Sequence, residues 1–340
     1  MTHGWRRRHA ERGSDNTQEN RVGWTGGGWI AERKFERNAV MRLGDAMTLK
    51  KLGVWAGLDG CSAADAAAFA KRVEAWGYGA LWIPEAIGRE VFTSSAWLLA
   101  NTRDLTVASG IANIYARDPI SAAAAQKGLN EQSSGRFLLG LGVSHIPLVE
   151  GVRRHDYGKP VATMRAYLEA MAQAPYRSVP PSDKPKTVLA ALGPKMLELS
   201  AKQADGAHPY NVKPEHTRQA RVILGTGKLL CVEQATILET DPSKARAMGR
   251  EFLAIYLGLP NYVNNWKRLG FADVDVAGGG SDRLIDAVIV WGNEKAIRAR
   301  IDEHWQAGAD HVCVQAIGEN GQPDERLLSL LAPNVSQNSA

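Results

Sequence analysis

One stretch, residues 105–145, constrains the fold of this chain more than any other. It opens with an apolar run over 105–113 (LTVASGIAN), continues with an alanine-rich helical segment that begins at Asp118, and closes with a second apolar run over 137–143. Strands that are apolar on both faces and are separated by a helix are typical of a βαβ unit with a parallel sheet. The stretch therefore predicts an α/β protein whose functional residues lie at the carboxyl ends of its strands.

The same alternation continues along the chain. We predict eight strands, at 52–57, 80–85, 105–113, 137–143, 186–192, 206–211, 229–238 and 311–317. We predict connecting helices at 63–76, 93–101, 119–132, 160–173, 194–203, 214–224 and 294–307, and further helical segments after the seventh strand at 242–258, 261–270 and 282–290. This alternation indicates a (β/α)8 or TIM barrel, rather than an open doubly wound sheet, with a helical insertion after strand 7.

Residues 1–48 differ from the rest of the chain. They are polar, rich in Gly and Arg, and without sustained apolar periodicity. We interpret them as a disordered or non-native N-terminal extension, with Met41 or Met47 as the true initiator. The alternative is an arm that binds nucleic acid or a partner. Residues 49–334 are predicted to form a single barrel domain, and 335–340 a disordered tail.

The charge of the chain does not indicate a nucleic-acid partner. The formal net charge is +5, but residues 1–48 hold nine Lys or Arg against six Asp or Glu and account for three of these charges. The barrel region is therefore close to neutral, and we predict no nucleic-acid partner for it.

Other classes of protein are excluded by similar arguments. No apolar run approaches the ~20 residues that span a bilayer, and residues 1–48 lack the apolar core of a signal peptide. Cys61, Cys231 and Cys313 are too few and too scattered for a disulfide framework or a zinc site. We therefore predict a cytoplasmic protein without a membrane span or a bound metal, whose cysteines are inert.

Several polar residues follow predicted strands and would meet at one rim of the barrel. They are Glu85, Asn113, Ser144, His145, the segment 192–195 and His208. A single Glu or His is more often structural than catalytic, so their convergence carries more weight than any one of them.

The segment Leu192-Gly193-Pro194-Lys195-Met196 joins a strand to a helix. Glycine lets a ligand approach the backbone, and a helix N-terminus offers unpaired N–H groups to an anion, which favours a phosphate site. An ordinary tight turn is the alternative. The Gly140-x-Gly142 pair does not complete the dinucleotide fingerprint, and no Ser-His-Asp elbow is present.

Four motifs, in this order, give the chain a family resemblance. They are ASGIAN at 108–113, GRFLLGLGVSH at 135–145, YGKP at 157–160, and LGPK at 192–195 followed by ADG at 204–206. Together they resemble the luciferase-like superfamily of flavin- and deazaflavin-dependent enzymes, and most closely its actinobacterial coenzyme F420-dependent oxidoreductase branch. The resemblance spans residues 52–331, and the family fold is a (β/α)8 barrel, which agrees with the strand pattern.

The resemblance implies a cofactor site. A non-proline cis peptide at Gly110–Ile111 is expected behind the tricyclic ring of the cofactor, and the segment 192–196 is expected at its phosphate. The residues implied as cofactor-binding are Ser109, Gly110, Ile111, Asn113, Val143, Ser144, Leu192, Gly193, Pro194, Lys195 and Met196. The implied cofactor is F420, with FMN as the alternative.

The chain departs from the family at the proton donor. Some F420-dependent relatives have a glutamate where this chain has His145, and several have an acidic residue followed by His where it has Pro84-Glu85. His145, which titrates near neutral pH, is the first candidate for an acid or base; Glu85 is the second. A third interpretation is that both side chains only hydrogen-bond the ring.

Three further residues are predicted around the substrate. Trp55, Trp82 and His208 lie on or after strands and are expected to line the substrate pocket, although a core position suits the two tryptophans equally.

The resemblance implies an F420-dependent oxidoreductase that transfers a hydride between the deazaflavin carbon 5 and a small organic substrate. An FMN-dependent, luciferase-like monooxygenase that uses O2 is one alternative. A non-catalytic flavin- or deazaflavin-binding protein is another. Relatives are often dimers, so a homodimer is a candidate assembly.

Overall fold

The computed structural model describes residues 49–318 and 321–334. The chain divides into two units, residues 1–43 and 44–340. The predicted extension at 1–48 and the predicted tail at 335–340 lie outside the described residues, and both remain predictions.

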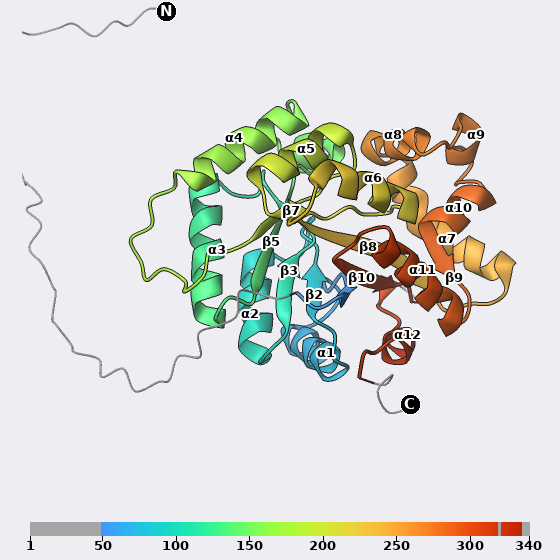
Figure 1. The fold of residues 1–340 in the computed structure, drawn as a ribbon, viewed down its shortest axis with the longest axis horizontal. Helices are drawn as coiled ribbons and strands as arrows, with labels where there is room; N and C mark the ends of the chain where they lie inside the picture. The colour runs from blue at the N-terminus through green and yellow to red at the C-terminus, as the bar shows by residue number, and fades with distance from the viewer. Residues whose placement is uncertain (1–48, 319–320, 335–340) are drawn as a thin grey trace, which may run out of the picture. The chain divides into compact units, whose positions relative to one another are not determined.

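Within the described residues, parallel strands close into a barrel (Figure 1). In order around the barrel, the strands are β1 (Leu52–Trp55), β2 (Ala80–Ile83), β3 (Thr106–Ser109), β5 (Phe137–Gly142), β6 (Thr187–Leu189), β7 (Gly206–Ala207), β8 (Leu229–Ile237) and β10 (His311–Ala316). The last strand, β10, pairs with both β1 and β8, and this double pairing closes the ring. The predicted (β/α)8 barrel is confirmed.

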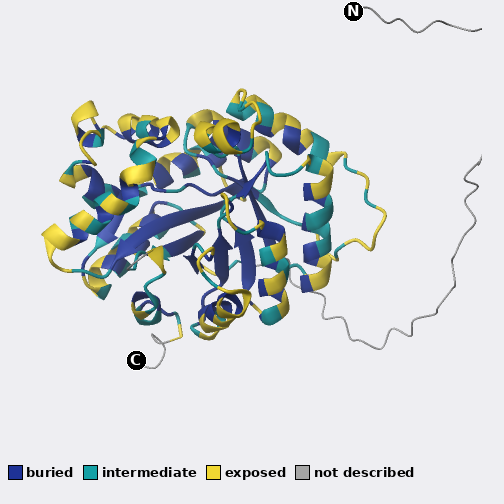
Figure 2. Ribbon diagram, turned by 180° about the vertical axis from the view of Figure 1, so that it is seen from behind, coloured by how far each residue is buried: buried dark blue, intermediate teal, exposed yellow. Residues whose placement is uncertain are grey.

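Helices surround this barrel and present their polar faces outward, as Figure 2 shows. They are α1 (Ala63–Ala75), α2 (Val91–Asn101), α3 (Pro119–Ser133), α4 (Pro160–Ala172), α5 (Pro194–Gln203), α6 (Pro214–Leu224), α11 (Glu294–Gln306) and α12 (Glu325–Leu330). Proline occupies the first turn of α3, α4, α5 and α6, where a missing N–H removes no helical hydrogen bond. None of the described helices is long and apolar enough to cross a membrane.

The segment after β8 forms the predicted helical insertion, with one difference. It contains α7 (Pro242–Leu257), α8 (Pro260–Arg268), α9 (Asp273–Val276) and α10 (Asp282–Val288), which gather beside β8 in Figure 1. The helix predicted to reach Val290 ends at Val288, and β9 (Ile289–Trp291) follows and pairs in parallel with β8. The predicted end was wrong because the Ile-Val-Trp run favours a strand, and β8 extends beyond β7 and offers it an edge.

The third predicted strand is interrupted in the middle. It forms β3 and β4 (Ala112–Asn113), and the Gly110–Ile111 peptide between them is cis, as the resemblance implied. The bulge lies against β5, where a Cβ at Gly140 would be 2.1 Å from the Ser109 carbonyl oxygen. Only glycine allows this approach.

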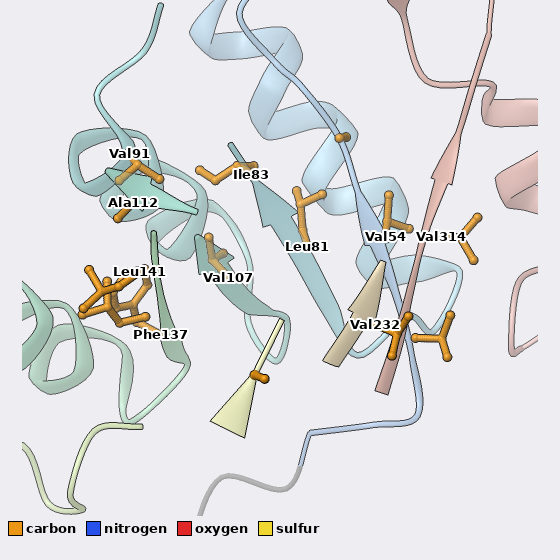
Figure 3. Packing of buried hydrophobic residues seen from close by; sticks show 14 of the residues in the cluster. Val54, Leu81, Ile83, Val91, Val107, Ala112, Phe137, Leu141, Val232 and Val314 are labelled. Carbon is orange, nitrogen blue, oxygen red and sulfur yellow. The ribbon is translucent and has the colours of Figure 1, made fainter. Parts of the chain in front are cut away.

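Two apolar layers position the strands. Figure 3 shows the outer layer, in which Val54, Leu81 and Val107 come from neighbouring strands and pack in the cluster between the barrel and its helices. The inner layer fills the barrel and includes Trp82, Leu138, Cys231 and Cys313. Burial raises the pKa of both cysteine thiols, as expected of inert residues.

Candidate active site

A cavity of about 640 Å³ lies at the carboxyl ends of the barrel strands. One side, the barrel wall, comes from residues that end or follow strands: Gly110, Ile111, Gly142, Val143, Leu192 and Gly193. The other side, the insertion wall, comes from α7, α8 and the residues between them: Ile255, Tyr256, Leu259, Asn261, Tyr262, Asn264 and Arg268. The position of the cavity is the one that a parallel barrel predicts.

The bulge at Gly110 forms the end of the cavity nearest the barrel core. Trp55 Nε1 donates a 3.1 Å hydrogen bond to the Gly110 carbonyl oxygen. A Cβ at Gly110 would lie 2.7 Å from Trp55 Nε1 and 3.2 Å from His208 Nε2, so the backbone here has no room for a side chain. Trp55 and His208 line the cavity, where the sequence placed them.

His208 is held in one orientation and one tautomer. Its ring stacks on Trp82 with centroids 4.3 Å apart, and Nδ1 donates to the Cys231 carbonyl oxygen at 2.8 Å. Burial lowers the pKa of His208 to about 4, against the opposing effect of that hydrogen bond. His208 is therefore a neutral imidazole whose Nε2 carries a lone pair, and no partner for Nε2 occurs among the described residues.

Trp82 does not line the cavity, and we correct that prediction. Its side chain is fully buried in the barrel beneath His208, and its Nε1 donates to His311 Nε2 at 3.0 Å. Trp55 and Trp82 are register partners on β1 and β2, yet only Trp55 reaches the cavity.

Glu85 lines the cavity but is fully engaged. Both of its oxygens accept hydrogen bonds from the guanidinium of Arg117, and the backbone N–H groups of Val91 and Asn113 donate to them as well. The side chain is 3% exposed. These contacts fit a carboxylate that fastens the loop after β2 to the loop after β4, and they leave little opportunity for Glu85 to donate a proton.

His145 lies at the rim of the cavity, after β5. The residue before it, Ser144, adopts a left-handed conformation with φ of 55°, and Tyr157 Oη donates to the Ser144 carbonyl oxygen at 3.1 Å. The His145 ring lies 5.7 Å from that of Tyr262 on the insertion wall. Burial lowers the pKa of His145, and a hydrogen bond with Asn261 partly opposes this, so the imidazole is mainly neutral near pH 7.

The segment 192–196 forms the N-terminus of α5. Gly193 is the N-cap without a side-chain hydrogen bond, and a Cβ there would lie 3.4 Å from the Nη2 atom of Arg268. Arg268 comes from α8 and donates to Asn265 Oδ1 at 3.3 Å, and it is not among the ion pairs found in the described part of the chain. A helix N-terminus and a guanidinium thus face one another and form a suitable anion site.

Two predicted cofactor residues act on the bulge rather than in the cavity. Ser109 Oγ donates to the Gly140 carbonyl oxygen and accepts from the Gly140 N–H, at 2.8 and 2.9 Å. Asn113 is fully buried and accepts from the Tyr115 N–H through Oδ1. Neither residue lines the cavity, whereas Gly110, Ile111, Val143, Ser144 and all of 192–196 do.

The insertion wall is the part of the site that the sequence analysis missed. Arg268, Tyr256 and Tyr262 were not predicted, because the rule of strand ends does not apply to helices. A signal was available in the spacing of four aromatic residues: Phe252 and Tyr256, and Tyr262 and Trp266, are each four positions apart and so share one helix face. No group of residues in the described ranges could hold a metal ion.

Comparisons with known proteins agree with the fold and the place of the site. Residues 45–311 match the family model described as luciferase-like monooxygenase. A Mycobacterium tuberculosis protein named as a coenzyme F420-dependent oxidoreductase is 24% identical over 71% of this chain and 87% of its own length. A 5,10-methylenetetrahydromethanopterin reductase of Archaeoglobus fulgidus is 26% identical over 72% of this chain and 87% of its own length.

Solved structures show the same fold at lower identity. An F420-dependent secondary alcohol dehydrogenase, in complex with an F420–acetone adduct, superposes with a TM-score of 0.65 at 13% identity, over 83% of this chain and 96% of the other. The oxygenating constituent of 3,6-diketocamphane monooxygenase of Pseudomonas putida, with FMN, superposes with a TM-score of 0.63 at 13% identity, over 85% and 98%. Because the family model covers most of the chain, this protein belongs to the luciferase-like monooxygenase family.

Proposed function

We propose that this protein is an F420-dependent oxidoreductase that transfers a hydride between the cofactor and a small organic substrate. The observation that carries the proposal is the anion site at one end of the cavity, where Arg268 faces the N-terminus of α5. F420 has a flat tricyclic ring and a phosphate, and the cavity offers a side-chain-poor wall at Gly110 and Gly142 for the first and this site for the second. The names of the curated relatives support F420 as the cofactor.

When bound, the deazaflavin supplies the carbon that gives or takes the hydride, and the protein supplies its position. Backbone N–H groups of 193–196 and the Arg268 guanidinium would hold the phosphate. The bulge at Gly110–Ile111 would support one face of the ring. Ser109 and Asn113 would maintain that bulge, since their side chains bind backbone atoms around it.

Of the two candidate proton carriers, the contacts favour His145. It is half-buried at the rim, and its neutral ring can accept a proton and return it near neutral pH. The engaged carboxylate of Glu85 fits a structural role better. We therefore propose His145 as the acid or base and Glu85 as a residue that positions the loops after β2 and β4.

An FMN-dependent monooxygenase is the second candidate, because FMN also has a tricyclic ring and a phosphate, and one structural neighbour contains it. The two functions differ in how a reduced cofactor responds to air. We expect the F420-loaded protein to keep the reduced cofactor until a carbonyl, enone or imine substrate is added, and then to regain the absorbance of the oxidised form. Rapid, substrate-dependent O2 consumption by the FMN-loaded protein, without turnover of F420, would replace our proposal by the monooxygenase. Binding without turnover of either cofactor would indicate a non-catalytic protein.

A further inference from the structure

Two tyrosines and a glutamine form a hydrogen-bonded chain beside the cavity. Tyr256 lies on α7, Tyr210 lies after β7, and Gln315 lies on β10. The hydroxyl oxygens of Tyr210 and Tyr256 are 2.9 Å apart, and Tyr210 Oη donates to Gln315 Oε1 at 2.7 Å. Both tyrosines line the cavity. Three elements that are far apart in the sequence thus converge on one polar chain.

The direction of the chain follows from counting protons. A tyrosine hydroxyl has one proton, and that of Tyr210 goes to Gln315. The proton between the two tyrosines therefore belongs to Tyr256, whose oxygen keeps a lone pair and acts as an acceptor. If the Gln315 amide turns over, its NH2 donates to Tyr210, Tyr210 donates to Tyr256, and Tyr256 donates a proton to a ligand.

The surroundings keep the chain neutral in either direction. Burial raises the pKa of Tyr256 to about 12 and that of Tyr210 well above its ordinary value. Aromatic rings enclose Tyr256: those of Phe252 and Tyr262 lie 5.5 and 5.0 Å from it. Water competes poorly for a hydroxyl in such surroundings, so a ligand oxygen is its natural partner.

A reversible partner suits one kind of substrate. An alcohol donates a hydrogen bond through its hydroxyl, whereas the carbonyl that remains after loss of a hydride and a proton only accepts. We propose that Tyr256 holds the substrate oxygen, and that the Tyr256–Tyr210–Gln315 chain reverses so that both partners of an alcohol–carbonyl pair bind. This rests on the proposed function, since the hydride goes to or comes from the deazaflavin.

Binding to complexes that cannot react tests the proposal without turnover. Acetophenone is titrated into the protein with oxidised F420, and 1-phenylethanol into the protein with reduced F420; ethylbenzene is the probe without an oxygen. Tyr256→Phe is expected to weaken binding of the ketone and the alcohol about tenfold and to leave ethylbenzene unchanged. The matched control is Tyr78→Phe, which removes a buried hydroxyl bonded to the Leu328 carbonyl oxygen, away from the cavity, and should change none of the three affinities.

The reversal itself is tested with Gln315→Glu, at a pH where the new carboxylate is ionised. A carboxylate only accepts, so Tyr210 must donate to it and Tyr256 must accept from the ligand. We expect the alcohol to bind within about threefold of its wild-type affinity and the ketone to lose about tenfold. Equal losses for both ligands, or a Tyr256→Phe variant that matches Tyr78→Phe, would overturn the proposal. If wild-type protein binds F420 normally and these results fail, only the chain is wrong; if F420 does not bind, the proposed function is wrong.

Discussion

The two walls of the cavity differ in what builds them. The barrel wall is mostly backbone and small side chains, and its shape comes from strands that pack on both faces. The insertion wall is made of long side chains on α7 and α8, among them Tyr256, Tyr262 and Arg268. The first suits a flat ring that is the same in every turnover, and the second suits a substrate that differs between relatives. We infer that the barrel sets the cofactor and that the insertion sets the substrate.

The largest predicted contrast between the walls is their response to acid. Burial lowers the pKa of His208 and His311, both beneath the barrel wall, to about 4, whereas an unfolded histidine has a pKa of ~6.5. Above pH 6.5 both states are neutral and the stability is complete. As the pH falls from 6.5 towards 4, the unfolded state takes up protons that the folded state refuses, and each histidine then costs about 1.4 kcal/mol per pH unit.

Urea unfolding at pH 7 and pH 4.5 measures this effect. We expect the free energy of unfolding to fall by several kcal/mol between them. The exposed His155 provides a control, because His155→Gln should leave the loss unchanged. A stability that stays level over this range would mean that His208 and His311 accept protons in the folded state.

The next effect tests the close packing under the barrel wall. Gly140→Ala would place a Cβ 2.1 Å from the Ser109 carbonyl oxygen, so β3 and β5 must separate. We expect a loss of about 3 kcal/mol of unfolding free energy, together with weaker cofactor binding. Gly128→Ala is the matched control: it lies within α3, its Cβ meets nothing within 4 Å, and it should be neutral or slightly stabilising. Equal stabilities of the two variants would show that the bulge does not depend on this contact.

The proton carrier comes next. His145→Ala should lower turnover by about 100-fold and change F420 affinity by less than about threefold, because a general acid acts on the reaction rather than on binding. Its pKa is lowered by burial, so turnover that needs the neutral ring should decline only below pH 6.5. Steady-state kinetics over pH 5–8 measure both effects. Unchanged turnover in the variant would remove His145 from the reaction.

The smallest of these effects concerns the one residue of the insertion wall that we assign to the cofactor. Arg268→Gln should weaken F420 binding about tenfold, and added salt should reduce the difference between the variant and the wild type. Arg250→Gln is the control, since Arg250 pairs with Asp282 and does not line the cavity. If the two variants bind F420 equally, the phosphate lies elsewhere and the division between the walls is simpler than we propose.

The same contrast explains what could be predicted from the sequence. Apolar runs at 105–113 and 137–143 indicated the barrel, and the residues after them, such as Gly110 and Ser144, could be placed because parallel strands end at one rim. The pattern could not separate Trp55 from Trp82, since both lie on buried strands and only packing decides which one reaches the cavity. It also could not reveal the partner of Glu85, because Arg117 is 32 positions away.

Equilibrium titration of the purified protein with F420 and with FMN, followed by quenching of tryptophan fluorescence, tests the central claim most directly. Trp55 lines the cavity and makes the signal sensitive to a bound ring. We predict saturable binding of F420 that is at least about tenfold tighter than that of FMN and that weakens in Arg268→Gln. Tight binding of FMN without binding of F420 would contradict the account.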